Sequence, residues 1–362
     1  MTLTEYNCPN CGGAVNFDAT TQHVKCQFCD SEFDIKALQN HSEECKLAED
    51  PIEWATHEDV EWMAGEQEGM RIYSCNTCAG EIITDESTVA TSCPYCGNPV
   101  VMKGQLTGSA KPDLIIPFKL DKKAAMDALQ KHLSGKKLLP KCFKSTKRLN
   151  EVKGLYVPFW LFDADVDVNM RYRATTMRMW SDARFNYTET RTFSVVRQGE
   201  LAFDNVPVDA SAKIPADLME SIEPFDIRDA KDFQPTFLAG YMADKFDFCE
   251  RHSIDRANER VRASCETAFR NTVAGYATVT PEYRGVYLKK SVVKYALMPV
   301  WVLCTTWRDK NYLFAMNGQT GKFIGDLPTD WGIFWRWFAI ITVIAFAVLF
   351  GLALLILYSH IN

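Results

Sequence analysis

The chain has 362 residues, of which 47% are hydrophobic and 24% charged, and a formal net charge of −6. This length suits two or three domains, and the balance of apolar and charged residues is that of a folded protein. The negative net charge excludes a globally basic protein that binds nucleic acid through overall charge. Thirteen cysteines are the unusual feature of the composition, and their spacing is informative.

Eight of these cysteines form two quartets with the same spacing, C-x2-C-x14-C-x2-C. A tetrahedral thiolate site needs two close pairs on tight turns, and we expect the stretch between the pairs to form a hairpin. The sequence therefore predicts two rubredoxin-like zinc ribbons, residues 1–40 and 71–103, which are small β domains that fold around their metal. The predicted ligands are Cys8, Cys11, Cys26 and Cys29 in the first ribbon and Cys75, Cys78, Cys93 and Cys96 in the second.

Two alternatives to zinc involve the same sulfurs. Disulfides would need an oxidising compartment, and residues 1–10 do not resemble a secretory signal. A repeated spacing favours metal over disulfides, while iron in a rubredoxin-like centre uses the same four sulfurs and remains open. We predict two Zn²⁺ ions in closed, structural sites, because four thiolates leave no position for water or substrate.

Residues 41–70, between the ribbons, form an acidic segment. Ten carboxylates lie from Glu43 to Glu68, against the single lysine Lys46, and the apolar residues there include Trp54 and Trp62. A solvated linker and a docking motif for a basic partner both fit this pattern.

Residues 104–330 read as an α+β cytosolic domain. Residues 111–153 are rich in lysine, which suits either a solvated face or a face toward anionic lipid, and contain a predicted helix at Ala124–Leu133. Alternating apolar residues predict strands from Leu155 onward, and the proline-free stretch 239–276 predicts one or two long helices. Further strands are expected at Val286–Trp307 and Tyr312–Met316, followed by tight turns at Asn317-Gly318 and Thr320-Gly321.

The C-terminal region predicts a single-pass transmembrane helix. From Trp337 to Tyr358 the chain carries 22 residues without a charge, which span about 33 Å as a helix. Aromatic residues at both ends match interfacial belts, and we take Trp337 and Tyr358 as the limits of a membrane anchor within residues 331–358, followed by a tail at 359–362. Lys322 and Arg336 precede the span, so the positive-inside rule leaves the N-terminal bulk in the cytosol.

The chain resembles a bacterial family with TFIIB-type zinc ribbons, a cytosolic body and C-terminal membrane anchoring. The resemblance is carried by the CPNC and CPYC knuckles and by short apolar motifs: Leu114–Phe118, Leu138–Phe143, Tyr156–Trp160, Met316–Lys322 and Gly325–Pro328. Some relatives are encoded beside flotillin-like (SPFH) proteins and phage-shock protein A. This implies a role in membrane-stress response or membrane organisation, with such proteins as partners, and implies no catalytic residues.

Relatives of that family are sometimes labelled replication-restart helicases, but the chain lacks the G-x-x-x-x-G-K-[ST] motif that such an ATPase needs. We find no other motif of a catalytic centre, and Cys142, Cys249, Cys265 and Cys304 lie mostly in apolar contexts. We therefore predict a non-enzymatic, membrane-anchored adaptor of the bacterial inner membrane that binds protein partners and the lipid bilayer. The alternative is a membrane-tethered nucleic-acid-binding zinc-ribbon protein without helicase activity.

Overall fold

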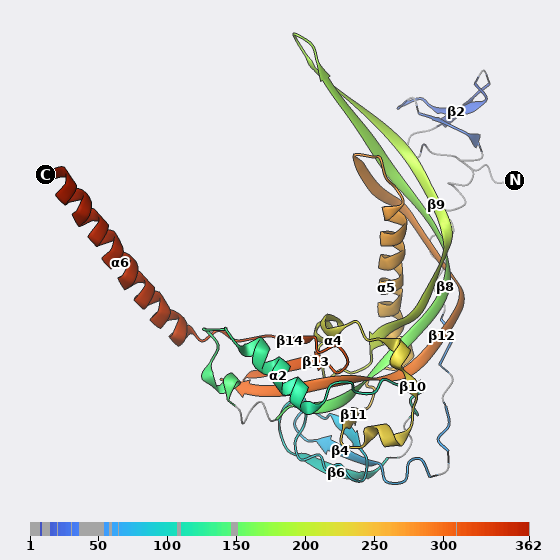
Figure 1. Ribbon diagram of the computed structural model, residues 1–362. Coiled ribbons are helices and arrows are strands. Elements are labelled where there is room, and N and C mark those ends of the chain that lie inside the picture. The colour runs from blue at the N-terminus through green and yellow to red at the C-terminus, as the bar shows by residue number, and fades with distance from the viewer. Residues whose placement is uncertain are drawn as a thin grey trace. The chain divides into compact units, whose positions relative to one another are not determined.

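The computed structural model shows a mixed α+β protein with small cysteine-rich β regions near the N-terminus and one long C-terminal helix (Figure 1). It describes residues 8, 15–19, 21–29, 31–35, 54–57, 60–63, 65–106, 110–145, 151–308 and 310–361. Contacts between residues divide the chain into two compact units, and each unit is built from three stretches of sequence. Unit 1 comprises Met1–Ala55, Phe162–Val206 and Ile254–Val292; unit 2 comprises Thr56–Leu161, Pro207–Ser253 and Val293–Asn362.

The elements follow one another in an order that moves between the two units. Unit 1 begins with β1 (Val15–Asp18), β2 (His23–Cys26) and β3 (Glu32–Phe33). Four elements run from one unit into the other: β8 (Lys153–Ser181), β9 (Asn186–Asp209), α5 (Glu250–Asn271) and β12 (Thr278–Trp307). The strands that lie wholly in unit 2 are β4 (Arg71–Cys75), β5 (Glu81–Thr84), β6 (Val100–Gln105), β7 (Leu114–Ile115), β10 (Lys231–Asp232), β11 (Met242–Asp244), β13 (Lys310–Asn317) and β14 (Phe323–Gly325). Its helices are α2 (Lys122–Leu133), α4 (Ala216–Ile222) and α6 (Trp331–Ile361), with short 3-10 turns η1 (Lys141–Lys144), η2 (Ile227–Asp229) and η3 (Pro235–Leu238).

The strands form two separate sheets. One has three strands in the order β1-β2-β3, and the other has eleven, with a central order of β10-β7-β12-β8-β11-β5-β4-β6. Strand β9 pairs with β8, and β13 pairs with both β12 and β14. Two of the pairings, β11 with β8 and β12 with β7, are parallel, so the larger sheet is mixed. Strands of 29 and 30 residues are far longer than the usual five or six.

Unit 1 is held together by α5 on one face of the long strands. Inward-facing residues alternate along β8, as a strand with one covered face requires. They are buried together with three residues that share one face of α5, namely Val261, Cys265 and Phe269. The buried β8 residues are Ala164, Val166, Val168, Met170, Tyr172 and Ala174. The paired ends of β8 and β9 continue past α5 to a turn near Asp182 (Figure 1).

Unit 2 has an aromatic and aliphatic core under its part of the sheet. Here β8 and β12 are buried on both faces, so the continuous apolar runs 155–162 and 295–303 replace the alternating pattern. Helix α2 is capped at its N-terminus by Asp121, whose carboxylate accepts the Ala124 N–H at 2.8 Å, and at its C-terminus by Ser134. Its buried residues Ala125, Leu129 and Leu133 pack with Phe314 and Met316 of β13. The helix expected at Ala124–Leu133 is therefore confirmed.

Both tryptophans of the acidic segment pack against the rest of the protein. Within unit 1, the Trp54 indole donates to the Asn258 side-chain oxygen of α5 at 2.7 Å and meets the Phe162 ring edge-on at 4.9 Å. Within unit 2, Trp62 meets the Phe233 ring at 5.9 Å. These contacts turn both tryptophans inward, so they are packing residues.

Two local expectations were wrong, for the same physical reason. The stretch 239–249 is not helical, because β11 lies there and pairs with β5 and β8; only the later part of the predicted helical stretch forms α5. Between the two cysteine pairs of the second ribbon there is one strand, β5, where a hairpin was expected. Strand β5 pairs instead with β4, which ends at Cys75, and with β11. In both places pairing with distant strands overrides the local pattern.

Candidate metal centre

The four cysteines of the second quartet converge in unit 2. Strand β4 ends at Cys75, the chain turns through Cys78, and the segment between β5 and β6 supplies Cys93 and Cys96. Each C-x2-C pair is closed by a backbone hydrogen bond back to its first cysteine, from Ala79 N–H to the Cys75 carbonyl at 2.9 Å and from Gly97 N–H to the Cys93 carbonyl at 3.1 Å. Ala79 and Gly97 both adopt positive φ, which this turn requires.

The sulfur positions fit a tetrahedral metal ion. All four Sγ atoms lie within 4.8 Å of one another, with Cys75 to Cys96 at 3.5 Å and Cys78 to Cys93 at 3.6 Å. Four thiolates about 2.3 Å from one Zn²⁺ would lie about 3.8 Å apart. All four cysteines are free of disulfides. The four-cysteine cluster can therefore hold a metal ion, in agreement with the sequence analysis.

Backbone N–H groups surround these sulfurs and tune their protonation. Burial opposes ionisation of Cys75, but N–H donors of Cys78 and Thr77 bring the pKa of its thiol down to about 7. Burial raises the pKa of the Cys78 and Cys93 thiols. The Asn98 side-chain amide also donates to the Cys96 sulfur at 3.5 Å. A bound cation would offset the cost of burying these sulfurs as thiolates. The N–H groups that donate to the sulfurs orient them as ligands.

The first quartet forms a smaller described cluster in unit 1. Sulfurs of Cys8, Cys26 and Cys29 lie within 4.8 Å of one another, and the Cys8 and Cys29 sulfurs are 3.6 Å apart. Cys11 lies outside the described residues. The hairpin expected between the pairs is present here, because β1 and β2 pair from Val15 with Cys26 to Asp18 with His23. Three thiols are thus in place for a second metal ion.

The two clusters differ in how they join the rest of the chain. Cys75, Cys93 and Tyr95 are buried in the same hydrophobic cluster as Leu155 and Val157 of β8, and β5 pairs with β11. The strands of the first ribbon form only their own three-stranded sheet. The four-cysteine cluster is therefore built into the larger sheet.

The remaining cysteines and the three alternate aspartates of β8 (Asp163, Asp165 and Asp167) form no metal-ligating group within the described residues. Cys265 is in the core of unit 1, where burial raises the pKa of its thiol to about 11. The Asp163 carboxylate accepts the Asn205 N–H at 2.6 Å, and Asp167 pairs with Lys289 at 2.9 Å. These two carboxylates are engaged with different partners, as structural residues are.

Sequence reasoning missed a group of neighbouring carboxylates in unit 2, one of which is buried. Asp244 of β11 is 2% exposed and accepts the Ser211 hydroxyl at 2.6 Å. Burial raises the pKa of both Asp244 and Asp209 to about 7, and neighbouring carboxylates, including Asp247, add to the effect. No sequence signal marks Asp244, because the stretch around it reads as helical.

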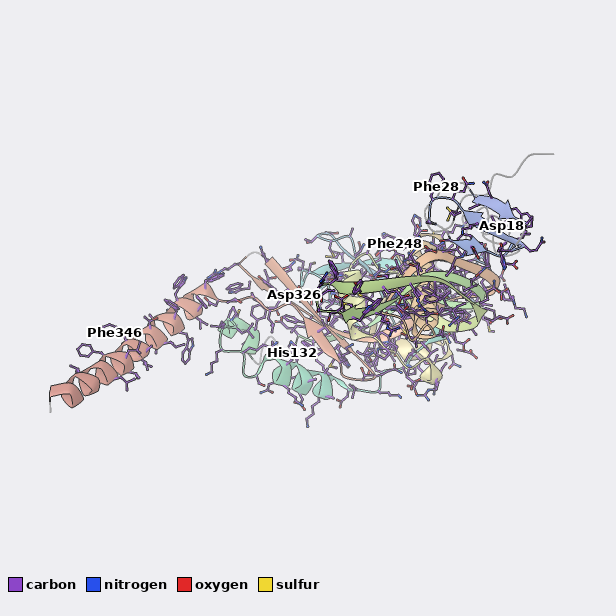
Figure 2. All side chains as sticks on the ribbon, turned by 90° about the horizontal axis from the view of Figure 1, so that it is seen from above. Asp18, Phe28, His132, Phe248, Asp326 and Phe346 are labelled. Carbon is purple, nitrogen blue, oxygen red and sulfur yellow. The ribbon has the colours of Figure 1, made fainter. Side chains whose placement is uncertain are left out.

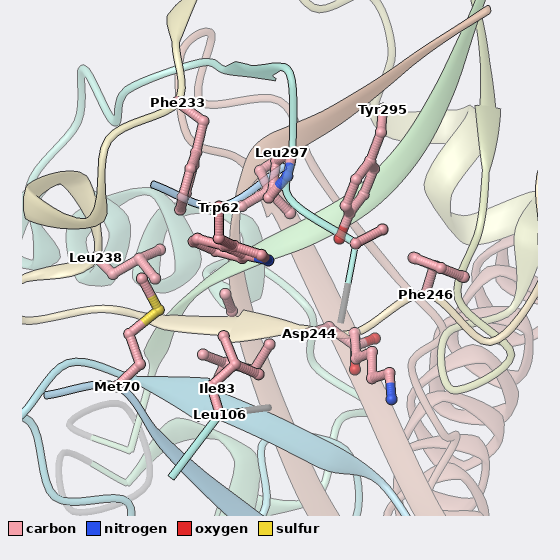
Figure 3. Close-up of a pocket in the computed structure, with 14 residues that line it drawn as sticks. Trp62, Met70, Ile83, Leu106, Phe233, Leu238, Asp244, Phe246, Tyr295 and Leu297 are labelled. Atoms are coloured by element: carbon pink, nitrogen blue, oxygen red, sulfur yellow. The ribbon is translucent and has the colours of Figure 1, made fainter. Parts of the chain in front are cut away.

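A small hollow lies beside Asp244. Figure 3 shows Trp62, Phe233, Phe246 and Tyr295 around it, together with aliphatic side chains. Its volume is about 20 Å³, which is room for about one water molecule. The hollow is therefore a gap in the packing of unit 2 and too small for an organic ligand.

Helix α6 is long and apolar enough to cross a membrane. Its segment Trp331–Leu352 has a mean hydropathy of 2.2, and none of its most apolar stretch is buried in the protein. Figure 2 shows Phe346 projecting from the helix without a covering element. Trp337 is 41% exposed on α6, and the helix backbone continues through the predicted limit Tyr358. These properties agree with the predicted span by length and composition.

Comparison with known proteins places the chain in a family. It is 30% identical over 337 residues to the "Uncharacterized protein YdjG" of Bacillus subtilis, an alignment that covers 93% of this chain and 94% of the relative. The chain belongs to the YdjG family. The alignment includes most of both units, so the similarity concerns the whole architecture and is not limited to the cysteine motifs. No family model and no solved structure matches the chain.

Proposed function

We propose that this member of the YdjG family is a non-enzymatic adaptor that holds a protein partner at the cytosolic face of the bacterial inner membrane. In this proposal α6 is the anchor, with the N-terminal bulk in the cytosol, and both cysteine clusters bind Zn²⁺ as TFIIB-type ribbons. The observation that carries it is the four-thiol cluster of Cys75, Cys78, Cys93 and Cys96, because its strands belong to the same sheet and unit as the chain that leads into α6. A closed set of four thiolates is typical of a structural metal site that fixes a binding surface.

Exposed apolar side chains on both ribbons support a protein partner. On the first ribbon, Phe28 lies between two candidate ligands and is 75% exposed, and Phe17 of β1 is 52% exposed. Figure 2 shows Phe28 at the surface of this ribbon. On the second ribbon, Val101 and Met102 of β6 are more than half exposed. Aromatic residues and methionine are enriched in protein interfaces.

The charges on the ribbons favour a protein over a nucleic acid. Lys25 of the first ribbon lies 3.7 Å from Glu32. On the second ribbon Arg71 pairs with Glu86, and Lys103 pairs with Glu81 at 2.6 Å. A surface that binds phosphates needs several cations that no carboxylate neutralises. The family resemblance adds flotillin-like (SPFH) and phage-shock-type proteins as the partner class, and membrane-stress response or membrane organisation as the setting.

Photo-crosslinking in cells tests this function. A photoreactive amino acid at Phe28 is expected to capture a protein partner in the membrane fraction, and the crosslink is expected to disappear in a Cys26→Ser variant. The same reactive residue at Phe346 serves as a control for unspecific capture by α6. Crosslinks that persist without Cys26, or tight and steeply salt-dependent retention of nucleic acid by the purified protein, would contradict the proposal.

A further inference from the structure

The lysine-rich stretch after α2 lies against the first turns of α6. The Asp330 N–H donates to the Leu138 carbonyl at 2.9 Å, and the Asp330 carboxylate accepts the Gly332 N–H at 2.9 Å at the start of the helix. One turn further along, the Lys137 ammonium lies 5.2 Å from the centre of the Trp337 ring. Residues far apart in sequence are thereby held at the point where α6 begins.

This arrangement is rigid because α2 is part of the core of unit 2. Leu129 and Leu133 of α2, with Leu139 after it, are buried against Phe314 and Met316 of β13. Leu327, just before α6, packs against the same cluster. The loop 134–138 is thus flanked on both sides by buried leucines, which hold the backbone that carries its two lysines.

Exposed cations gather around this point. Lys136, Lys137 and Arg336 are exposed, and Arg308 is 62% exposed at the turn between β12 and β13, 4.0 Å from Asp330. Lys136 donates to the His132 ring at 3.0 Å. Burial and the charge of Lys136 lower the pKa of His132, so the imidazole is neutral at pH 7 and adds no charge to the cluster. The Asp330 carboxylate, which caps α6, lies beside one of these cations, 4.0 Å from Arg308.

The tryptophans of α6 indicate at which level of a bilayer this cluster of cations would lie. Trp331, Trp335 and Trp337 are each more than 40% exposed on the first two turns of α6, and tryptophan prefers the headgroup layer. A lysine that touches Trp337 therefore lies at the level of lipid phosphates, and its long side chain can reach them. This reasoning rests on α6 being the membrane anchor of the proposed function.

We propose that Lys136, Lys137, Arg308 and Arg336 form a binding surface for anionic phospholipid headgroups at the start of α6. The supporting argument is charge complementarity at a defined depth: four exposed cations lie near the start of an apolar helix, where Lys137 contacts Trp337 and Arg308 lies beside Asp330. Each cation near an anionic membrane surface strengthens binding about fivefold. The surface selects the lipids around the anchor and orients unit 2 at the membrane.

Lipid retention by the full-length protein tests this surface. The chain is incorporated into liposomes of equimolar phosphatidylglycerol and phosphatidylcholine, extracted in mild detergent, and the retained lipids are counted by native mass spectrometry. We expect phosphatidylglycerol to be enriched, and the enrichment to fall at least about fivefold in a Lys136→Glu/Lys137→Glu variant. A Lys231→Glu/Lys290→Glu variant is the matched control, with the same change in net charge at exposed positions on β10 and β12, and is expected to retain the enrichment.

The outcomes separate this inference from the proposed function. A chain that stays in the liposomes after alkaline carbonate washing but shows no enrichment, or shows an equal loss in both variants, overturns the lipid surface and leaves the anchor intact. Displacement of phosphatidylglycerol by free glycerol phosphate overturns the assignment to lipid. A chain that carbonate removes from the liposomes overturns the anchor and the lipid surface together.

Discussion

Loss of one ligand from the second cysteine quartet should destabilise unit 2, whereas loss of one from the first quartet should not. The two substitutions to compare are Cys93→Ser and Cys26→Ser, which both replace a buried cysteine, 1% and 0% exposed. Cys93 lies in the hydrophobic cluster of unit 2, and the strands of its ribbon pair with the larger sheet. Cys26 lies in a separate three-stranded sheet of unit 1.

The expected magnitude follows from the metal. A structural Zn²⁺ site contributes about 10–16 kcal/mol of apparent binding free energy at neutral pH. If one of four thiolates accounts for roughly a quarter of the lower value, its loss costs about 2.5 kcal/mol while the ion is still held, and departure of the ion from the weakened site adds to this cost. For a folded unit of about 150–250 residues the melting temperature is therefore expected to fall by at least about 5–10 °C.

Hydrogen exchange on the detergent-solubilised protein localises the effect. In Cys93→Ser we expect faster exchange in β11 (Met242–Asp244), which pairs with β5 of the ribbon, and a loss of one zinc per chain by elemental analysis. In Cys26→Ser we expect one zinc to be lost while β11 keeps its protection. Equal effects of the two substitutions on β11, or full zinc content in Cys93→Ser, would refute the reasoning.

Two further predictions concern buried residues of unit 2. Because burial raises the pKa of Asp244 to about 7, above its unfolded value, the protonated carboxyl stabilises the fold at low pH. In urea unfolding of zinc-loaded protein, Asp244 should account for a loss of about 1.4 kcal/mol in the free energy of unfolding from pH 6 to 8.5, and Asp244→Asn should remove this share. Gly154→Ala should cost about 1–3 kcal/mol in the same assay, because the new Cβ would lie 2.5 Å from the Tyr241 ring, which stacks on Phe118 and cannot easily move. Gly351→Ala, with nothing within 4 Å, is the control, and an equal cost of both alanine substitutions would contradict the steric argument.

The sequence by itself determined the features that depend on local spacing and composition. The spacing of the eight cysteines predicts which of them cluster, because a C-x2-C turn and a tetrahedral ion allow few other arrangements. Seven of the eight converge among the described residues. The apolar run of α6 needs no partner to be recognised, and α2 carries its own cap at Asp121. In each case the deciding interactions join residues that are close in sequence.

The tertiary structure alone decided how the strands pair. Strand β11 forms in a stretch that reads as helix, because β5 and β8 offer it hydrogen bonds on both sides. The same pairing inserts the second ribbon into the larger sheet and buries Asp244. It also places Lys137 against Trp337, two residues 200 positions apart. Contacts between distant segments leave no periodic trace in either segment, so no local pattern could reveal them.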